Sequence, residues 1–358
     1  MRWHGLLGLF LLFKQSTKAE QYIVSNDSNP WLLSSCDLAE PRLVYKNTHF
    51  EVAEEIGVLS NNTEAWIGYV SVKVPYFFHG CAQVQTTETY SVARIGYCQN
   101  QCGHNRPFGI KAQNGEDILN PTSLIDCICF YTSVPEILFG HFDNDKKNRF
   151  EKDGYAIFTQ ISLNNSTVFN RGEEINSDCL IYKYPAFQWK PCTSLNDRTV
   201  ICSNTTAARA YVLPYWSKTW IEGNVYCLKK NMYPANVSSI VASGLNEGQQ
   251  QHGPWTGVVR ASTLINKADM RSFGTMQYLG AEYAFLQGSE KRLKFEAYGV
   301  KQALCFTVNR TSFIPTEREE ITTKSNEKSP ALMTGIGVLV GVLVVVGIGF
   351  DVVMCRRR

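Results

Sequence analysis

One stretch near the carboxyl end restricts what this 358-residue chain can fold into more than any other feature. Ala331–Phe350 contains no charged side chain, with Lys328 before it and three terminal arginines after it. A helix of about twenty apolar residues is long enough to cross the hydrocarbon core of a bilayer. The sequence therefore predicts a transmembrane helix over residues 331–354 and a tail, residues 355–358, that is too short for a signalling domain.

The amino-terminal residues 1–19 have the composition of a secretory signal peptide. Arg2 gives a positive start, Leu6–Phe13 is apolar, and Ala19 is a small residue at the expected cleavage site. The alternative is a short membrane anchor, but eight helical residues rise only about 12 Å. A cleaved leader and the terminal arginines together predict a single-pass type I protein of the cell membrane, with residues 20–330 outside the cell.

Two glycines in the predicted span, Gly337 and Gly341, lie four residues apart. Small residues at this spacing let two membrane helices approach closely. They point to a dimer formed through the span, and the alternative is a plain anchor, because glycine is common in single spans.

The charge of the chain excludes one class of partner. The formal net charge is +3, but six basic residues lie in the two predicted terminal segments. Without them, and without Asp351, the remainder has 29 basic and 31 acidic residues. Nucleic-acid binding depends on clustered Lys and Arg side chains, so no nucleic-acid partner is expected.

Seven Asn-x-Ser/Thr triplets lie between the predicted leader and the predicted span, where the glycosylation machinery acts. They predict a surface glycoprotein, and only one of the two overlapping sites is expected to be occupied. The acceptor residues are Asn26, Asn61, Asn164, Asn165, Asn204, Asn236 and Asn309.

Eleven cysteines precede the predicted span. In a secreted region they predict disulfides, including Cys98, Cys102, Cys127 and Cys129. A zinc site would need thiolate pairs such as C-x-x-C, whereas these pairs are C-x-x-x-C and C-x-C without regularly spaced histidines. No metal and no cofactor is therefore predicted. Because eleven is odd, one cysteine is left unpaired, bonds another chain, or has lost its partner.

Cys192 and Cys202 are separated by nine residues that include Asn196-Asp197. This spacing fits a disulfide across a hairpin, so the two cysteines are predicted to be bonded to each other.

The expected fold class is α+β, a strand-rich and disulfide-stabilised ectodomain followed by one transmembrane helix. Composition divides the ectodomain into a cysteine-rich domain (20–132), a strand-rich segment (133–206), a third domain (207–309) and a polar stalk (310–330).

One helix has a recognisable start and end. Thr219 and Glu222 have the spacing of a capping box, and Val225 and Leu228 fall on one apolar face with Cys227. Asn231 and Pro234 then predict the end of the helix.

The order of motifs in the cysteine-rich domain resembles a known module. Gly80-Cys81 is followed by a helical C-x-x-x-C, a Phe108-Gly-Ile110 strand and Cys127-x-Cys129. This order is similar to the WSC module, a small disulfide-rich domain associated with carbohydrate binding at cell surfaces. Two further cysteines that the module has after C-x-C are missing here. The resemblance covers about 66–131 and implies recognition of a glycan.

The third domain resembles the C-type-lectin-like domain. The similarity rests on a helix that bears Cys227, a Trp255-Thr-Gly257 strand and a final strand that carries Cys305. In that family the first and last cysteines are bonded, which here implies a Cys227–Cys305 disulfide. The family's Glu-Pro-Asn, Gln-Pro-Asp and Trp-Asn-Asp calcium triplets are absent, so no calcium site is carried over. Trp66-Ile-Gly68 shares the Trp-x-Gly pattern and hints at an ancient repeat.

No catalytic motif is present: G-x-S-x-G, H-E-x-x-H, a phosphate-binding loop and G-x-G-x-x-G are all missing from the sequence. The preferred hypothesis is a non-enzymatic surface glycoprotein that binds an extracellular protein or glycan, through residues that the sequence does not identify. The first alternative is a viral envelope glycoprotein for attachment, in the host membrane and the virion. The second is a membrane-tethered glycan esterase or hydrolase.

Overall fold

A computed structural model describes residues 21–46, 48–85, 88–103, 105–112, 118–119, 124–131, 133–139, 154–163, 168–169, 177–204, 209–246, 253–272 and 280–307. All of them belong to one compact unit that ends at Val308. The predicted leader, stalk, tail and membrane span, with Gly337 and Gly341, lie outside the described residues. Among the described residues there is no helix that is both long and apolar enough to span a bilayer.

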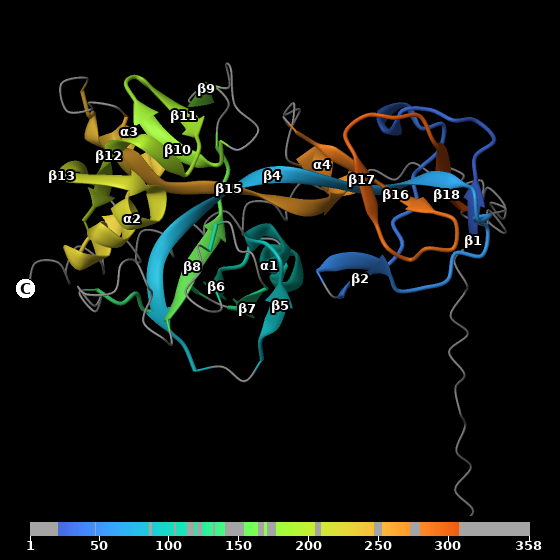
Figure 1. Cartoon of the computed structure of the whole chain (residues 1–358), viewed down its shortest axis with the longest axis horizontal. Coiled ribbons are helices and arrows are strands. Elements are labelled where there is room, and N and C mark those ends of the chain that lie inside the picture. Colours follow the sequence, from blue (N-terminus) through green and yellow to red (C-terminus); the bar gives the residue numbers. More distant parts are fainter. Residues whose placement is uncertain are drawn as a thin grey trace, which may run out of the picture. The chain divides into compact units, whose positions relative to one another are not determined.

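Strands make up most of the described chain, which confirms the strand-rich α+β class (Figure 1). The helices are the 3-10 helix η1 (Trp31–Leu33) and α1 (Ile95–Cys102), α2 (Trp220–Lys229), α3 (Val237–Ser243) and α4 (Lys267–Ser272). The strands are β1 (Gln21–Val24), β2 (Leu43–Lys46), β3 (His49–Val52), β4 (Glu64–Gln83), β5 (Tyr90–Val92), β6 (Phe108–Ala112), β7 (Ile125–Cys129), β8 (Gly154–Gln160), β9 (Val168–Phe169), β10 (Cys179–Lys183), β11 (Ala186–Lys190), β12 (Thr193–Ser203), β13 (Ala210–Thr219), β14 (Tyr233–Pro234), β15 (Trp255–Asn266), β16 (Glu282–Gln287), β17 (Lys294–Glu296) and β18 (Gln302–Thr307).

The long strand β4 organises the sheet. It pairs with β16 and β18 along its first half, with β15 along its middle, and with β8 along its second half. Its side chains are buried on both faces over most of its length, because other layers cover it on each side. β4 therefore continues as one strand for twenty residues.

The sheet crosses both predicted boundaries of the ectodomain. β4 comes from segment 20–132, and its neighbours β8 and β15 come from segments 133–206 and 207–309. β1, at the start of the first segment, pairs with β18 at the end of the last one. The three sequence segments are therefore interleaved and do not form three separate modules in the described part of the chain.

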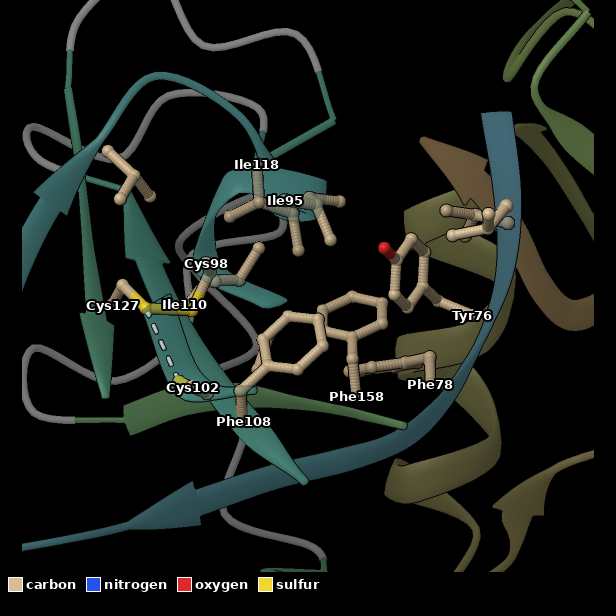
Figure 2. Close-up of a cluster of buried hydrophobic side chains, with 14 of the residues drawn as sticks. Tyr76, Phe78, Ile95, Cys98, Cys102, Phe108, Ile110, Ile118, Cys127 and Phe158 are labelled. Carbon is tan, nitrogen blue, oxygen red and sulfur yellow. Dashed lines mark hydrogen bonds between the residues drawn. A yellow bond between two sulfur atoms is a disulfide. The ribbon is translucent and has the colours of Figure 1, made fainter. Parts of the chain in front are cut away.

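A disulfide-rich layer, which we define as α1 with β5, β6, β7 and β8, packs on the second half of β4. Its core is a row of aromatic rings, with Phe108 and Phe158 stacked at 6.0 Å and Phe78 of β4 at 5.3 Å from Phe158 (Figure 2). Large rings of this kind contribute much of the apolar area that a layer buries.

The predicted capping box of α2 is confirmed. The Thr219 side chain accepts a hydrogen bond from the backbone amide of Glu222 at 3.2 Å. Asn231 has a φ of 56°, the left-handed conformation that follows the end of the helix. Val225 and Leu228 are buried, as the apolar face predicts.

One histidine in β4 contributes to the pH dependence of stability. The His79 Nε2 atom lies 2.8 Å from the Thr159 hydroxyl, and burial lowers the pKa of His79 from 6.5 to about 4. The unfolded chain therefore binds a proton below about pH 6.5 that the folded chain does not bind until about pH 4. The His79 contribution to the free energy of unfolding is fully present above pH 6.5, and up to roughly 3 kcal/mol is lost as the pH falls to 4.

Urea denaturation at several pH values between 7 and 4 measures this loss. The variant His79→Gln keeps a polar side chain without a titrating group, so its free energy of unfolding should depend less steeply on pH over the same range. Parallel pH profiles for the two proteins would contradict the assignment to His79.

Candidate ligand-binding surface

The disulfide-rich layer is held together by two parallel bridges. Cys98 is bonded to Cys127 and Cys102 to Cys129, with Cα–Cα distances of 5.5 and 5.1 Å. One turn of α1 separates the two helical cysteines, and the C-x-C cysteines follow one another on β7, so the bridges tie the helix to the strand. This rigid base positions the loops at the end of the layer.

An exposed aromatic ring and an arginine meet at that end. Phe130 donates its backbone amide to the carbonyl of Pro107 at 3.0 Å, which fixes the loop before β6 against the residues that follow β7. The Arg106 guanidinium carbon then lies 5.3 Å from the centroid of the Tyr131 ring. Tyr131 is 69% exposed, so most of this ring faces solvent although its position is restrained.

A tyrosine and a carboxylate from the neighbouring strand adjoin this pair. Tyr90 of β5 lies opposite Cys127 in the register with β7, and its hydroxyl donates to Glu88 at 2.8 Å. The hydrogen bond with Glu88 raises the pKa of Tyr90, with a smaller contribution from Tyr131. We define Glu88, Tyr90, Arg106 and Tyr131 as the Tyr131 surface.

The Tyr131 surface offers the contacts that a sugar ring uses. An exposed aromatic face packs against the apolar C–H face of a pyranose, while a guanidinium donates to hydroxyl or carboxylate oxygens and a carboxylate accepts from hydroxyls. Its groups suit non-covalent binding.

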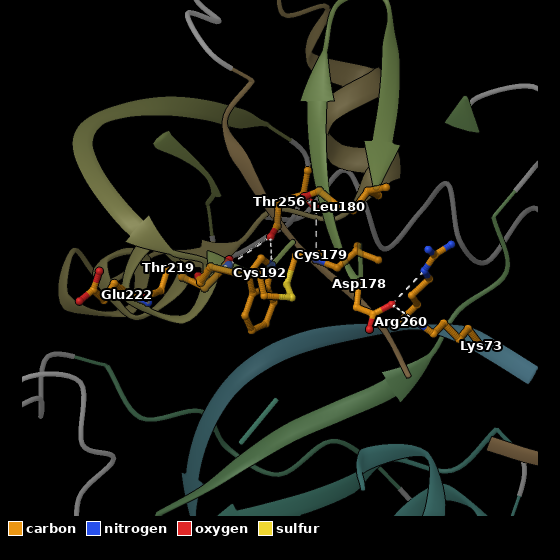
Figure 3. Close-up of a disulfide and its surroundings, with 12 residues drawn as sticks. Lys73, Asp178, Cys179, Leu180, Cys192, Thr219, Glu222, Thr256 and Arg260 are labelled. Carbon is orange, nitrogen blue, oxygen red and sulfur yellow. Dashed lines mark hydrogen bonds and ion pairs between the residues drawn. A yellow bond between two sulfur atoms is a disulfide. The ribbon is translucent and has the colours of Figure 1, made fainter. Parts of the chain in front are cut away.

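The structure corrects the predicted Cys192–Cys202 disulfide. The residues between the two cysteines do not form a hairpin: Cys192 immediately precedes β12, which runs from Thr193 to Ser203 and pairs with β13, and Cys202 lies near its end. Cys192 is bonded instead to Cys179 of β10, beside Thr219 (Figure 3).

The implied Cys227–Cys305 disulfide is also wrong. Cys227 of α2 is bonded to Cys202, because α2 packs on β12. Cys305 of β18 is bonded to Cys36, which lies close to it because neighbouring Leu38 forms a bridge with Cys305.

The odd cysteine is Cys81. Of the cysteines that the structure describes, it alone has no disulfide partner, and it is buried in β4. Burial raises the pKa of the Cys81 thiol well above its usual value, which keeps it protonated and poorly nucleophilic. Cys81 therefore acts as a small apolar core residue.

One group of three cysteine sulfurs has the spacing of metal ligands. The Sγ atoms of Cys98, Cys102 and Cys127 lie within 4.8 Å of one another. Each of them is already in a disulfide, and a metal is bound by thiolates, so this donor set does not suit an ion in the oxidised protein.

Four of the predicted glycosylation sites fall in the described chain. Asn26 and Asn61 are exposed, and Asn204 is half-buried. Asn236 caps α3 through its Oδ1 atom, which accepts from the Ser239 amide at 2.7 Å, whereas a glycan would attach to Nδ2. The other three sites, Asn164, Asn165 and Asn309, lie outside the described residues.

Sequence reasoning did not identify the residues of the Tyr131 surface. The signal available was the position of Tyr131 two residues after Cys129, where a large aromatic side chain follows the last cysteine of a small layer. The partner Arg106 is 25 residues away in the sequence, and nothing local links the two.

Comparisons of the chain with protein families, with curated proteins and with solved structures found no match.

Proposed function

We propose that the chain is a single-pass type I membrane glycoprotein of the cell surface that binds glycans through the Tyr131 surface, without catalysis. The observation that carries the proposal is the restrained and exposed Tyr131 ring under Arg106, on a layer fixed by two disulfides. A binding site that is already ordered loses little conformational entropy when the ligand binds.

The location at the cell surface rests on the twenty-residue uncharged run, on the leader and on the disulfides. Five disulfides in the described chain are the pattern of an oxidising compartment. The exposed Asn26 and Asn61 sites are accessible for glycosylation.

Binding is tested with the full chain displayed on transfected cells and probed with a library of fluorescent glycan polymers. We expect at least one glycan class to bind the wild type, and Tyr131→Ala to reduce its affinity about tenfold, because stacking on an aromatic ring contributes about 1 to 2 kcal/mol. Arg106→Gln should reduce the affinity as well.

Tyr298→Ala is the matched control. Tyr298 is 88% exposed and belongs to a different part of the surface, so its removal tests for a general effect of losing an exposed tyrosine. Equal losses of binding in both tyrosine variants, or no glycan bound by the wild type, would contradict the proposal.

A further inference from the structure

We infer that the described ectodomain consists of two copies of one folding unit, and that the two copies have exchanged their carboxyl-terminal halves. The starting point is the pair of tripeptides Trp66-Ile-Gly68 and Trp255-Thr-Gly257, which are 189 residues apart. The first lies in β4 and the second begins β15. Several hydrogen bonds and strand pairings around the two tripeptides are equivalent.

Each tripeptide receives a hydrogen bond from a second tryptophan. The Trp31 indole nitrogen donates to the carbonyl of Ile67 at 2.7 Å, and the Trp220 indole nitrogen donates to the carbonyl of Thr256 at 2.7 Å. In both cases the donor precedes the acceptor by 36 residues. Trp31 and Trp220 are again 189 residues apart.

Each glycine also makes the same backbone contact with an alanine. The amide of Gly68 donates to Ala39 and the amide of Gly257 donates to Ala235, both at 2.7 Å. A Cβ atom added to Gly68 would lie 3.2 Å from the Ala39 carbonyl oxygen, and one added to Gly257 would lie 3.1 Å from that of Ala235. Glycine is needed at both positions because the backbones approach so closely.

Each unit is closed by a strand from the other half of the chain, β18 in the unit that contains β4 and β12 in the unit that contains β15. The two closing strands make equivalent contacts. Ala39 donates its amide to Leu304 of β18 at 2.8 Å, and Ala235 donates to Ile201 of β12 at 3.1 Å. β18 pairs in parallel with β4, and β12 pairs in parallel with β15.

Each closing strand carries a cysteine, Cys305 in β18 and Cys202 in β12, and a basic side chain shortly before this cysteine lies over the tryptophan of the tripeptide. The Lys301 ammonium lies 5.0 Å from the centroid of the Trp66 ring, and the Arg198 guanidinium carbon lies 5.2 Å from that of Trp255. Lys301 and Arg198 are each four residues before the closing cysteine, Cys305 or Cys202.

The remaining strands complete the correspondence. β1 pairs with β18 as β13 pairs with β12, both antiparallel. The antiparallel pair β16–β17 lies beside β4, and the antiparallel pair β10–β11 lies beside β15. Phe285 pairs with Trp66 and Ile181 pairs with Trp255, so the register is the same.

The ribbon that joins the two units has the symmetry expected of an exchange. β4 and β15 are antiparallel, and Lys73 lies opposite Ser262, which is 189 residues later. A rotation about this pair superimposes each strand on the other. The disulfide-rich layer is then an insertion in the first copy, between β4 and β10, and the described residues of the second copy contain no counterpart.

The connection between the copies accounts for the exchange. β12, which closes one unit, and β13, which begins the next, form a hairpin joined by residues 204–209, and the Asn204 amide donates to the Arg209 carbonyl at 3.1 Å. Because of this hairpin, β12 of the first copy stays beside β13 and closes the unit that contains β15 of the second copy. The unit that contains β4 is therefore closed by β18, which belongs to the second copy. Short connections favour the exchange of identical elements between repeated units.

The exchange predicts which cysteines are bonded in the full chain. Exchanged copies give Cys36–Cys305 and Cys202–Cys227, whereas copies closed in sequence order would give Cys36–Cys202 and Cys227–Cys305. Mass spectrometry of unreduced peptides from the wild-type protein should find the exchanged pairs alone. Finding the pairs of the sequence-order arrangement in the wild type would overturn the inference.

The equivalence of the two closing strands, β12 and β18, is tested by lengthening the connection between β12 and β13. A flexible insertion of about twenty residues between Ala207 and Ala208 spans far more than the native hairpin loop. We expect about a tenth or more of this full-length variant to carry the pairs of the sequence-order arrangement. The same insertion between the exposed residues Gly57 and Val58 leaves the hairpin intact and should give the exchanged pairs alone. No change of pairing in the first variant, or the same change in both, would show that the strands are not interchangeable.

Discussion

Replacing Cys36 and Cys305 together by serine should lower the free energy of unfolding by up to about 5 kcal/mol. This disulfide joins the two ends of the described chain, with a sequence separation of 269 residues. A bridge that closes a long loop removes more conformational entropy from the unfolded chain than one that closes a short loop. The figure is an upper value, because the other four bridges already restrict the unfolded chain.

The double serine variant of Cys179 and Cys192 is the matched control. That bridge has a sequence separation of only 13 residues, and its loss should lower the free energy of unfolding by about 3 kcal/mol. Urea denaturation followed by pulse proteolysis measures both variants under oxidising conditions. A Cys36/Cys305 variant that is as stable as the wild type would contradict the role of this bridge in closing the unit.

Gly96→Ala should destabilise the protein by about 3 kcal/mol or more. A Cβ atom added at Gly96 would lie 2.0 Å from the backbone oxygen of Ser262, so α1 would have to move away from β15. Polar contacts at this junction would be lost with the movement. Thr263 donates its hydroxyl to the Gly96 carbonyl at 3.0 Å, and Asn100 donates its side-chain amide to the Leu264 carbonyl at 2.6 Å.

Gly57→Ala is the control for this prediction. No atom lies within 4 Å of a Cβ added at Gly57. The free energy of unfolding of the Gly57→Ala variant should therefore differ from that of the wild type by less than about 0.5 kcal/mol. Equal melting temperatures for Gly96→Ala and Gly57→Ala would show that α1 does not pack on β15 as described.

Local features of the fold could be predicted from the sequence because they depend on neighbouring residues. The capping of α2 needs only Thr219 and Glu222, and the helical C-x-x-x-C of α1 places Cys98 and Cys102 one turn apart. The strand character around Phe108 and Trp255 follows from composition in the same way.

The long-range arrangement could not be predicted, because its partners are far apart in the sequence. Nothing near Cys36 indicates that it bonds Cys305, and the apolar run of β4 does not show which strands flank it. The error at Cys192 and Cys202 has a local origin: polar residues that suggested a hairpin turn, Asn196-Asp197, lie within β12, where its register with β13 shifts between Thr193 and Arg198. The local turn signal here marks an irregularity in one strand, not a hairpin between two strands.

The Tyr131 surface illustrates the same limit for function. Aromatic side chains are normally assigned to the core, and only its exposure in the folded structure distinguishes Tyr131 from Phe108, which is fully buried. Arg106 stands next to Pro107 in a loop, and its position over the ring depends on the pairing of β6 with β7.

Surface topology is the claim on which the proposed function depends, and selective permeabilisation measures it most directly. The full chain carries one epitope tag after residue 20 and a second at its carboxyl end, and antibodies are applied to intact and to permeabilised cells. We predict that the first tag is stained on intact cells and the second only after permeabilisation. Staining of both tags only after permeabilisation, on a protein without glycans, would contradict the account.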